Sequence, residues 1–426
     1  MYLIIKTMIR KLPCLLMPFF IVVFIGCNNN PEPGQNQSLP LRPTTPIMGW
    51  SSWNEFNTNI SEEIIMTQAD AMVSTGMKDA GYTYINIDDG YFYGRDENGK
   101  VQSNPQKFPD GMAALAAYIK SKGLKAGIYT DAGINTCASC WSRDTLGMGV
   151  GLWGHDRNDI TQYLVDWGYD FIKVDWCGAE WMELEQSWRY TQISNTIREI
   201  RPDAVFNICS WGFPGTWVVN TADSWRISYD IKNNFESILY IIDLNADLWE
   251  YSSPGHVNDM DMLQVGRGMS YDEDKAHFTM WCFMNSPLIA GNDLTNMSQQ
   301  TLSILTNREL IAINQDPMGY QARRLKSENG LEIWARPLIH VTSGEVAVAL
   351  FNRTERSAKI GLNLKEVGID AEKGYHVHDL WEKTNEEDIT KPELTYEVPS
   401  HGIVALRIKG ENIPYNIFQT KTRGFN

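Results

Sequence analysis

Carboxylates stand at the ends of short apolar segments in this sequence of 426 residues. The segment from Phe171 to Cys177 carries Lys173 and, two residues on, Asp175. Side chains two residues apart on a strand share one side, so the ammonium should lower the pKa of Asp175 and keep it ionised, as a nucleophile requires. A second segment, Trp225 to Tyr229, is followed by Asp230, where partial desolvation should raise the pKa, as a general acid requires. Two such carboxylates suit hydrolysis of a glycosidic bond.

A metal enzyme is the alternative that these residues leave open. The pairs Asp88-Asp89 and Asp259-x-Asp261 offer oxygen ligands that suit Mg²⁺ or Ca²⁺. Among the histidines only His256 lies near them, which disfavours zinc. Cys137 and Cys140 form a C-x-x-C motif, which can indicate redox or zinc chemistry. Both are disfavoured here, because a second such motif is missing and the strand context does not suit a thioredoxin.

Strand-like and helix-like segments alternate from residue 46 onward and must position these side chains. Eight strands are expected, at 46–50, 82–88, 125–130, 170–176, 205–210, 225–229, 255–260 and 286–291. Amphipathic helices are expected between and after them, at 62–78, 111–122, 159–167, 182–200, 235–248, 272–283 and 298–313. Eight strands with crossover helices predict an α/β fold, a (β/α)8 TIM barrel over residues 44–318. A doubly wound sheet is the alternative, but it favours a glycine-rich loop after the first strand, and Gly49 to Trp53 does not match one.

Most of the expected strands end in carboxylates, aromatic residues or cysteines. In a barrel these ends converge on one face, where crowded carboxylates need a polyhydroxylated ligand, a metal or Lys and Arg to balance them. The residues concerned are Trp50, Trp53, Asp88, Asp89, Tyr129, Asp131, Lys173, Asp175, Cys177, Cys209, Ser210, Trp211, Arg226, Asp230, Asp259, Asp261, Asn292 and Asp293. We therefore expect a site at this face.

The pattern changes after Pro317. Short strands separated by turns follow, at 331–336, 345–352, 358–363, 375–379, 394–398 and 402–408. They predict a small antiparallel β-sandwich domain over residues 319–410, followed by a tail at 411–426.

Composition narrows the partners. The formal net charge is −15, from 37 Lys and Arg against 52 Asp and Glu, which argues against nucleic acid because phosphates need cationic side chains. The 15 Trp, 18 Tyr and 15 Phe supply flat apolar faces that can form core or contact sugar rings. Oligomeric state is left open by the sequence.

The first 27 residues resemble an export signal rather than part of a folded domain. Lys6, Arg10 and Lys11 precede an apolar run that ends at Gly26-Cys27, as in bacterial lipoprotein signals, with Cys27 as the lipidated residue. An ordinary signal peptide or an uncleaved anchor is the alternative. Residues 28–43, rich in Asn, Pro, Gln and Ser, indicate a flexible tether. We expect an exported lipoprotein that contacts a membrane through its lipid alone and faces the periplasm or the cell surface.

Several of these segments together resemble glycoside hydrolase family 27, the family of α-galactosidases and α-N-acetylgalactosaminidases. The motifs occur in order from about residue 45 to about residue 320, and the C-terminal β-domain also fits. They are Pro46-Ile47-Met48-Gly49-Trp50-Ser51-Ser52-Trp53, Asn86-Ile87-Asp88-Asp89-Gly90, Gly127-Ile128-Tyr129-Thr130-Asp131, Lys173-Val174-Asp175-Trp176-Cys177, Asn258-Asp259-Met260-Asp261-Met262 and Ala312-Ile313-Asn314-Gln315-Asp316-Pro317.

The resemblance implies a retaining exo-α-galactosidase that needs no metal or other cofactor. It implies Asp175 as the nucleophile and Asp230 as the general acid/base. It also implies sugar contacts from Trp53, Asp88, Asp89, Tyr129, Lys173, Arg226 and Asp261. Finally, it implies a disulfide between Cys137 and Cys177 that pins two loops of the active site.

One departure leaves the substrate open. Ser210 occupies a position near the 2-substituent of the sugar, where α-galactosidases often have Glu and where a small Ser gives room for an acetamido group. Phe213, in the loop that follows, is expected to fill the space beside Ser210. The resemblance thus favours an α-galactoside, with α-N-acetylgalactosaminide and β-L-arabinopyranoside as alternatives.

Overall fold

The structure is a computed structural model that describes residues 42–340 and 344–413. The expected signal segment, its Cys27, the tether up to residue 41 and the tail from residue 414 lie outside the described residues. No helix of the described part is both long and apolar enough to cross a bilayer.

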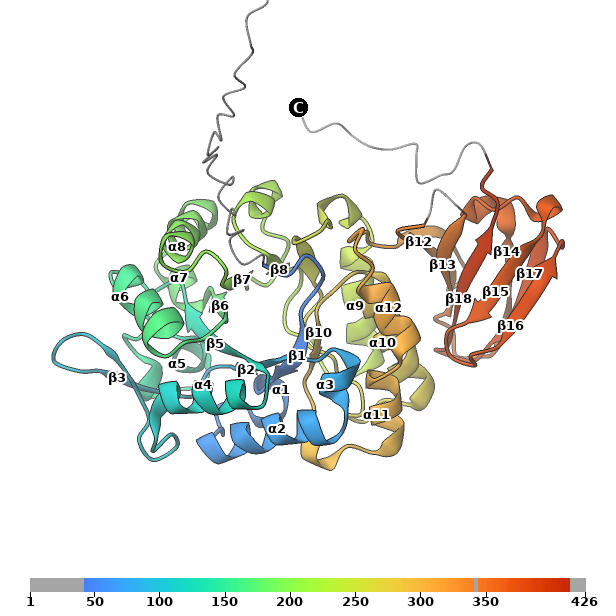
Figure 1. The fold of residues 1–426 in the computed structure, drawn as a ribbon. Helices are drawn as coiled ribbons and strands as arrows, with labels where there is room; N and C mark the ends of the chain where they lie inside the picture. The colour runs from blue at the N-terminus through green and yellow to red at the C-terminus, as the bar shows by residue number, and fades with distance from the viewer. Residues whose placement is uncertain (1–41, 341–343, 414–426) are drawn as a thin grey trace, which may run out of the picture. The chain divides into compact units, whose positions relative to one another are not determined.

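Eight parallel strands form the sheet that holds the first domain, and each of the eight expected strands is found (Figure 1). They pair in the order β10-β1-β2-β5-β6-β7-β8-β9. Their bounds are β1 (Met48–Ser51), β2 (Tyr84–Ile87), β5 (Lys125–Asp131), β6 (Phe171–Asp175), β7 (Val205–Ile208), β8 (Ser224–Arg226), β9 (Val257–Asp259) and β10 (Leu288–Ala290). This curled sheet with helices around it has the arrangement of a TIM barrel.

The two ends of this strand order meet through the segment that follows β9. Leu263 forms a parallel bridge with Ala290 of β10, and its N–H donates to the carbonyl of Ile289 at 2.7 Å. Met260 N–H donates to the hydroxyl of Ser286 at 3.0 Å. The short β9 strand is therefore prolonged by backbone and side-chain contacts that complete the ring.

Helices follow the strands, with some expected helices divided. The main ones are α2 (Glu62–Ser74), α3 (Met77–Ala80), α4 (Gly111–Ser121), α6 (Asp156–Thr161), α8 (Gln186–Ile200), α9 (Phe235–Asn245), α10 (Tyr271–Phe283), α11 (Gln299–Leu305) and α12 (Arg308–Asn314). α6 continues into a π-helical turn, η2 (Gln162–Asp166). The expected helix 62–78 breaks at Gly76, which adopts φ +82°, and 298–313 breaks at Asn307, whose side chain caps α12 by accepting from the N–H groups of Glu309 and Leu310.

Several elements near the carboxyl ends of the strands were not expected from the sequence. The hairpin of β3 (Phe92–Arg95) and β4 (Val101–Ser103) follows β2, and the short helices α1 (Trp53–Phe56), α5 (Cys137–Trp141) and α7 (Cys177–Trp181) follow β1, β5 and β6. Each is too short for a periodic apolar pattern to show in the sequence.

The second domain is an antiparallel β-sandwich, as expected, with two more strands than the sequence indicated. One sheet has the order β11-β12-β13-β18-β15-β16 and the other pairs β14 with β17. The bounds are β11 (Arg323–Glu328), β12 (Leu331–Pro337), β13 (Glu345–Asn352), β14 (Ala358–Asn363), β15 (Tyr375–Asp379), β16 (Asn385–Ile389), β17 (Glu393–Val398) and β18 (Ile403–Gly410). The unexpected strands β11 and β16 lie at the edges of the larger sheet and are rich in charged residues, so no apolar alternation marks them.

A buried arginine joins the two domains. Arg336 of β12 is fully buried and donates to the carbonyl of Cys282 at 2.6 Å and to Asn285 Oδ1 at 2.9 Å. Trp381 Nε1 donates to Thr279 Oγ1 of α10 at 3.0 Å. Because a buried guanidinium stripped of these partners is costly, the β-sandwich stabilises α10, which supports the barrel.

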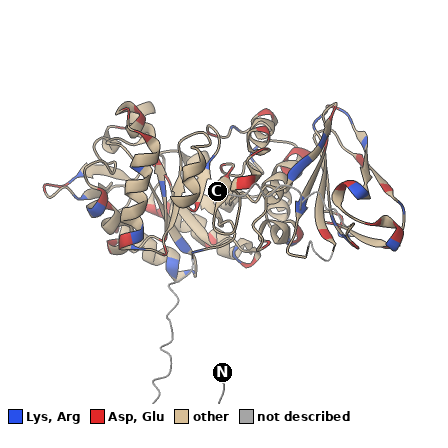
Figure 2. Cartoon of the chain, turned by 90° about the horizontal axis from the view of Figure 1, so that it is seen from above, with Lys and Arg blue, Asp and Glu red and all other residues tan. Residues whose placement is uncertain are grey.

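Charged residues of both signs are interspersed along the described chain (Figure 2). The acidic excess lies in the barrel, because residues 44–318 contain 36 Asp and Glu against 18 Lys and Arg, whereas residues 319–410 contain 14 against 13.

Candidate active site

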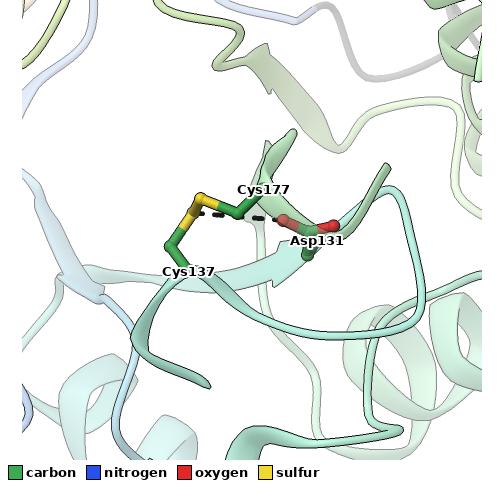
Figure 3. A group of neighbouring side chains, drawn as sticks. All are labelled: Asp131, Cys137 and Cys177. Carbon is green, nitrogen blue, oxygen red and sulfur yellow. Dashed lines mark hydrogen bonds between the residues drawn. A yellow bond between two sulfur atoms is a disulfide. The ribbon is translucent and has the colours of Figure 1, made fainter. Parts of the chain in front are cut away.

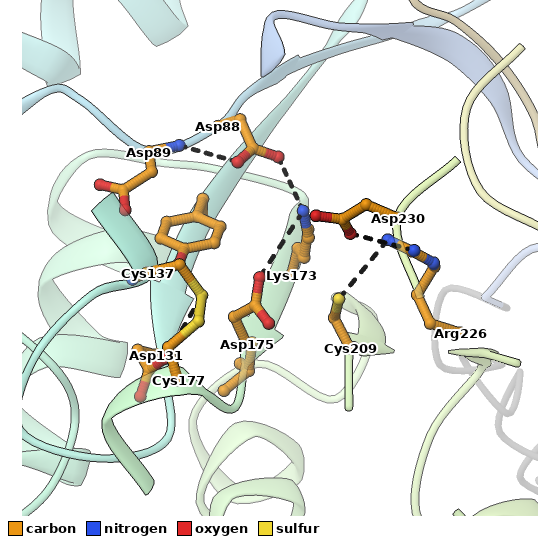
Figure 4. Close-up of polar contacts among 12 residues, drawn as sticks. Asp88, Asp89, Asp131, Cys137, Lys173, Asp175, Cys177, Cys209, Arg226 and Asp230 are labelled. Atoms are coloured by element: carbon orange, nitrogen blue, oxygen red, sulfur yellow. Dashed lines mark hydrogen bonds and ion pairs between the residues drawn. A yellow bond between two sulfur atoms is a disulfide. The ribbon is translucent and has the colours of Figure 1, made fainter. Parts of the chain in front are cut away.

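A cavity of about 470 Å³ opens at the carboxyl ends of the barrel strands. Nine of the ten residues implied as catalytic or sugar-binding, all except Ser210, line it together with Cys137 and Cys177. Figure 4 shows several of them, among them Asp88, Lys173, Asp175 and Asp230. The lining residues are Trp53, Asn54, Asp88, Asp89, Tyr129, Cys137, Trp141, Ser142, Lys173, Asp175, Cys177, Glu180, Trp211, Arg226, Tyr229, Asp230, Asp261 and Met262. Residues up to 209 positions apart in the sequence therefore meet at one face.

Two consecutive carboxylates form the buried part of the cavity wall. Asp88 and Asp89 follow β2 and are 4% and 1% exposed. Asp89 accepts from the N–H groups of Gly90 at 2.7 Å and Ala138 at 2.8 Å, which fixes both of its oxygens. Burial raises the pKa of Asp89 to about 7, and neighbouring Asp88 adds to the rise. Such fixed carboxylates present acceptors to hydroxyl groups of a ligand.

Lys173 of β6 lies between two carboxylates of the cavity. Its Nζ is 2.9 Å from Asp88 Oδ2 and 3.9 Å from Asp175 Oδ2. Burial by itself would lower the pKa of Lys173, but the charges of Asp88 and then Asp175 hold it well above its ordinary value. The ammonium is therefore charged, and it is bonded more closely to Asp88 than to Asp175.

Arg226 of β8 also serves two carboxylates. Its Nη2 is 2.7 Å from Asp261 Oδ2 and 3.1 Å from Asp230 Oδ1. Asp261, held at φ +74°, is buried and also accepts from the N–H of Ile231 at 2.8 Å. The guanidinium is 3% exposed, whereas the Asp230 side chain is 67% exposed. Asp230 is thus the carboxylate at the solvent-facing mouth.

The acidities of Asp175 and Asp230 differ from those expected from the sequence. Burial raises the pKa of Asp175 to about 6. Lys173 acts to lower this pKa, but its ammonium lies closer to Asp88 than to Asp175, and its effect is smaller than that of burial. Burial also acts to raise the pKa of Asp230, but the nearby charges of Arg226 and Lys173 outweigh it and lower the value. Both directions expected from the sequence are therefore wrong, although both side chains are mainly ionised near pH 7.

A disulfide joins Cys137 of α5 to Cys177 of α7 (Figure 3). Asp131 at the end of β5 lies beside it and accepts from the N–H groups of Gly133 at 2.7 Å and Gly178 at 3.1 Å. A Cβ on Gly178 would lie 2.2 Å from the carbonyl oxygen of Asn135, so the two loops require glycine where they pass. Two cysteines committed to a disulfide cannot ligate a metal as thiolates, so this cluster is a structural clamp.

The clamp also positions two residues of the cavity wall. The N–H of Cys137 donates to the phenol oxygen of Tyr129 at 3.2 Å, and the next N–H, of Ala138, holds Asp89. Tyr129 is 1% exposed and lies under Lys173, whose Nζ is 5.3 Å from the ring centroid. The start of α5 therefore aligns two walls of the cavity.

The loop after β7 differs from the expectation. Ser210 does not line the cavity, and its hydroxyl is buried with no hydrogen-bond partner among the described residues. The next residue, Trp211, has φ +57° and does line the cavity. Phe213 packs on Tyr251, with ring centroids 4.6 Å apart, and is not part of the lining. Trp211 instead of Phe213 thus forms the wall next to Ser210.

Sequence reasoning missed some of the lining. These residues are Asn54, Trp141, Ser142, Glu180, Tyr229 and Met262, besides Trp211, whose role at the wall was not singled out. Several of them belong to the short helices α5 and α7 or directly follow α5, and these helices had no periodic signal. Spacing offers one clue: each disulfide cysteine is followed four residues later by a tryptophan.

The metal alternative can be examined from the donors themselves. Asp88 and Asp261, one from each candidate pair, are bonded to Lys173 and Arg226. Asp259 accepts from Asn207 Nδ2 at 2.8 Å. Protein cations and amides thus occupy the carboxylates that would have formed the oxygen ligands of an ion.

Comparison with known proteins gives a consistent result. The profile of the family described as alpha galactosidase A matches residues 45–316, and that of the alpha galactosidase C-terminal beta sandwich domain matches residues 328–408. Alpha-galactosidase A of Cellvibrio japonicus is 42% identical over 388 residues, which cover 85% of this chain and 92% of that protein.

Two solved structures share the fold. Alpha-galactosidase I from Mortierella vinacea has a TM-score of 0.79 at 28% identity and covers 88% of this chain and 99% of its own. The α-galactosidase from Saccharomyces cerevisiae, solved with raffinose, has a TM-score of 0.75 at 25% identity and covers 87% of this chain and 100% of its own. With both domains matched and most of a relative's length aligned, this chain belongs to glycoside hydrolase family 27, the α-galactosidase family.

Proposed function

We propose that this protein is a retaining exo-α-galactosidase that removes terminal α-galactosyl residues from oligo- or polysaccharides. One observation carries the proposal: a buried carboxylate, Asp175, and a mouth carboxylate, Asp230, line one cavity whose inner wall is Asp88, Asp89 and Lys173. A closed inner wall and an open mouth suit a terminal sugar bound inward with its leaving group outward.

In the first step, an oxygen of Asp175 forms a bond to the anomeric carbon while the bond from that carbon to the glycosidic oxygen breaks. Asp230 gives its proton to the departing oxygen. A β-linked galactosyl ester on Asp175 results. In the second step, water attacks the same carbon, Asp230 takes its proton, and Asp175 leaves as the carboxylate. Two inversions return the α-configured sugar.

The acidities follow this cycle. Asp175 has a pKa of about 6 and is mostly ionised at pH 7, so it can attack. Asp230 is held ionised by Arg226 in the open site, and a bound leaving group that displaces water from it would raise its pKa toward that of an acid. Once Asp175 is esterified, one negative charge near Asp230 is gone, which lowers the pKa again and suits the base of the second step.

Galactose is the sugar that the inner wall suits. Asp88 and Asp89 together offer four carboxylate oxygens beside the Lys173 ammonium, matching a sugar with adjacent axial and exocyclic hydroxyls. The Saccharomyces cerevisiae relative was solved with raffinose, a galactose-terminated trisaccharide. Arabinopyranose lacks the C6 arm and would leave part of this wall unbonded.

The α-N-acetylgalactosaminide is the second candidate, and Ser210 favours it because a small side chain gives room near the 2-substituent. Trp211, which lines the cavity, reduces that room. We expect kcat/KM for p-nitrophenyl α-galactoside to exceed that for the N-acetyl sugar by at least about tenfold, a difference that one unfavourable contact is enough to produce. Purified residues 28–426 assayed on both substrates test this. The opposite preference would assign the N-acetyl sugar, and turnover of p-nitrophenyl β-L-arabinopyranoside alone would assign the pentose.

We also propose that the protein is an exported lipoprotein anchored through Cys27. The basic residues, the apolar run and Gly26-Cys27 support it, and the disulfide near the cavity suits an oxidising compartment. Labelled palmitate should enter the wild-type chain in a bacterial host and be absent from Cys27→Ala. Equal labelling of both chains, or none of either, would contradict the assignment.

A further inference from the structure

Two exposed tryptophans stand beside the mouth of the cavity. Trp141 ends α5 and Trp181 ends α7, and they are 63% and 62% exposed. Their ring centroids are 5.8 Å apart, with planes at 80°. An edge-to-face pair leaves ring faces free for another ligand.

The disulfide keeps the pair together. Cys137 begins α5 and Cys177 begins α7, so each indole lies one helical turn from a half-cystine. The Cα atoms of the two cysteines are 5.0 Å apart. Two large apolar side chains are thus held exposed to solvent. Burying their apolar surface would have stabilised the fold, so their exposure needs another explanation.

Polar groups lie next to the pair. Trp141, Glu180 and Ser142 all line the cavity, and Glu180 and Ser142 are neighbours of the two tryptophans in sequence. Glu180 and Ser142 are exposed. Indole faces for the C–H side of a sugar ring, with a carboxylate and a hydroxyl for its O–H groups, are complementary to a carbohydrate.

The leaving group must pass this rim. Asp230 protonates the glycosidic oxygen and is exposed at the mouth, whereas Asp88, Asp89 and Tyr129, on the galactose side, are buried. A leaving group attached near Asp230 therefore extends outward, where Trp141 and Glu180 form the cavity edge.

We propose that the rim formed by Trp141, Ser142, Glu180 and Trp181 is a binding site for the first sugar residues of the leaving group. This rests on the proposed function and deepens it: the preferred substrates are galactose-terminated oligosaccharides or branched polysaccharides rather than galactosides with small leaving groups.

Two substrates that differ only beyond the galactosyl unit test the proposal. α-Galactosyl fluoride has a leaving group too small to reach the rim, and a mannotriose with one α-galactosyl branch extends across it. The ratio of kcat/KM for the oligosaccharide to kcat/KM for the fluoride should fall about tenfold in Trp181→Ala and in Trp141→Ala, mainly through KM, because stacking on an indole is lost. Trp141→Phe should retain part of the ratio.

Trp188→Ala is the matched control. Trp188 is 50% exposed, forms an edge contact with Trp153 at 6.1 Å, and is absent from the cavity lining. The ratio of kcat/KM for the oligosaccharide to kcat/KM for the fluoride in Trp188→Ala should equal that of the wild type. Unchanged ratios in both rim variants, or equal losses on the two substrates, would overturn the subsite. If the wild type fails to hydrolyse the fluoride, the proposed function is itself wrong, and the subsite falls with it.

Discussion

Asp175→Asn is expected to lower kcat on p-nitrophenyl α-galactoside by at least about ten-thousandfold, because an amide cannot form the galactosyl ester. Folding should be preserved. Burial raises the pKa of Asp175 from 3.8 to about 6, so its ionisation destabilises the folded state; that cost is absent below 3.8 and complete above about 6. The amide carries no such cost, so the melting temperature at pH 7.5 should be no lower than that of the wild type.

The wild type gives the matching pH dependence. Its kcat/KM on α-galactosyl fluoride should fall as the pH decreases through about 6, where Asp175 takes a proton and loses its nucleophilicity. Normal turnover by Asp175→Asn would exclude Asp175 as the nucleophile.

Chemical rescue separates loss of the nucleophile from general damage. In Asp175→Gly, azide can enter the vacated space and form the bond to the anomeric carbon as the leaving group departs, which gives β-galactosyl azide after a single inversion. The product is identified by NMR of its anomeric proton. An α-galactosyl azide from this variant would show that another carboxylate forms the ester.

Asp230→Asn is expected to have the second-largest effect, and the effect should depend on the leaving group. For raffinose, whose sugar oxygen needs a proton to depart, kcat/KM should fall by about 10³–10⁴-fold. The leaving group of 2,4-dinitrophenyl α-galactoside departs without a proton, so kcat/KM for this substrate should fall less than about tenfold. Initial rates on both substrates, fitted for kcat/KM, provide the measurement.

A second signature follows from the missing base. In Asp230→Asn the galactosyl ester should persist, and azide, which needs no deprotonation, should accelerate its breakdown and give α-galactosyl azide after two inversions. Asp259→Asn is the control: Asp259 lies outside the lining of the main cavity and should show neither azide acceleration nor dependence on the leaving group. Equal losses on both substrates in Asp230→Asn would count against Asp230 as the acid.

Local sequence was sufficient for the framework. The eight parallel strands are three to seven residues long, and each expected strand contains or overlaps the observed one. The carboxylates after them were recognisable because a barrel brings strand ends to one face, whatever their separation in the chain. Short elements escaped: α5 and α7 have five residues each, and the edge strands β11 and β16 are rich in charged residues without apolar alternation.

Acidity and cavity lining depended on the tertiary structure. The sequence spacing predicted that Lys173 would pair with Asp175 and lower its pKa. The ammonium lies closer to Asp88, which follows another strand, so burial has the larger effect on the pKa of Asp175. At Asp230 nearby positive charge outweighs burial and lowers the pKa, because the Arg226 guanidinium lies 3.1 Å from the carboxylate.

The sequence by itself determined the barrel, the β-sandwich and the set of carboxylates, since periodicity and residue type are local properties. Only the tertiary structure decided that Trp211 and not Phe213 reaches the cavity, and that Trp141 and Trp181 meet beside its mouth. Pair distances, desolvation and side-chain direction arise from contacts between segments far apart in the chain, and no local pattern encodes them.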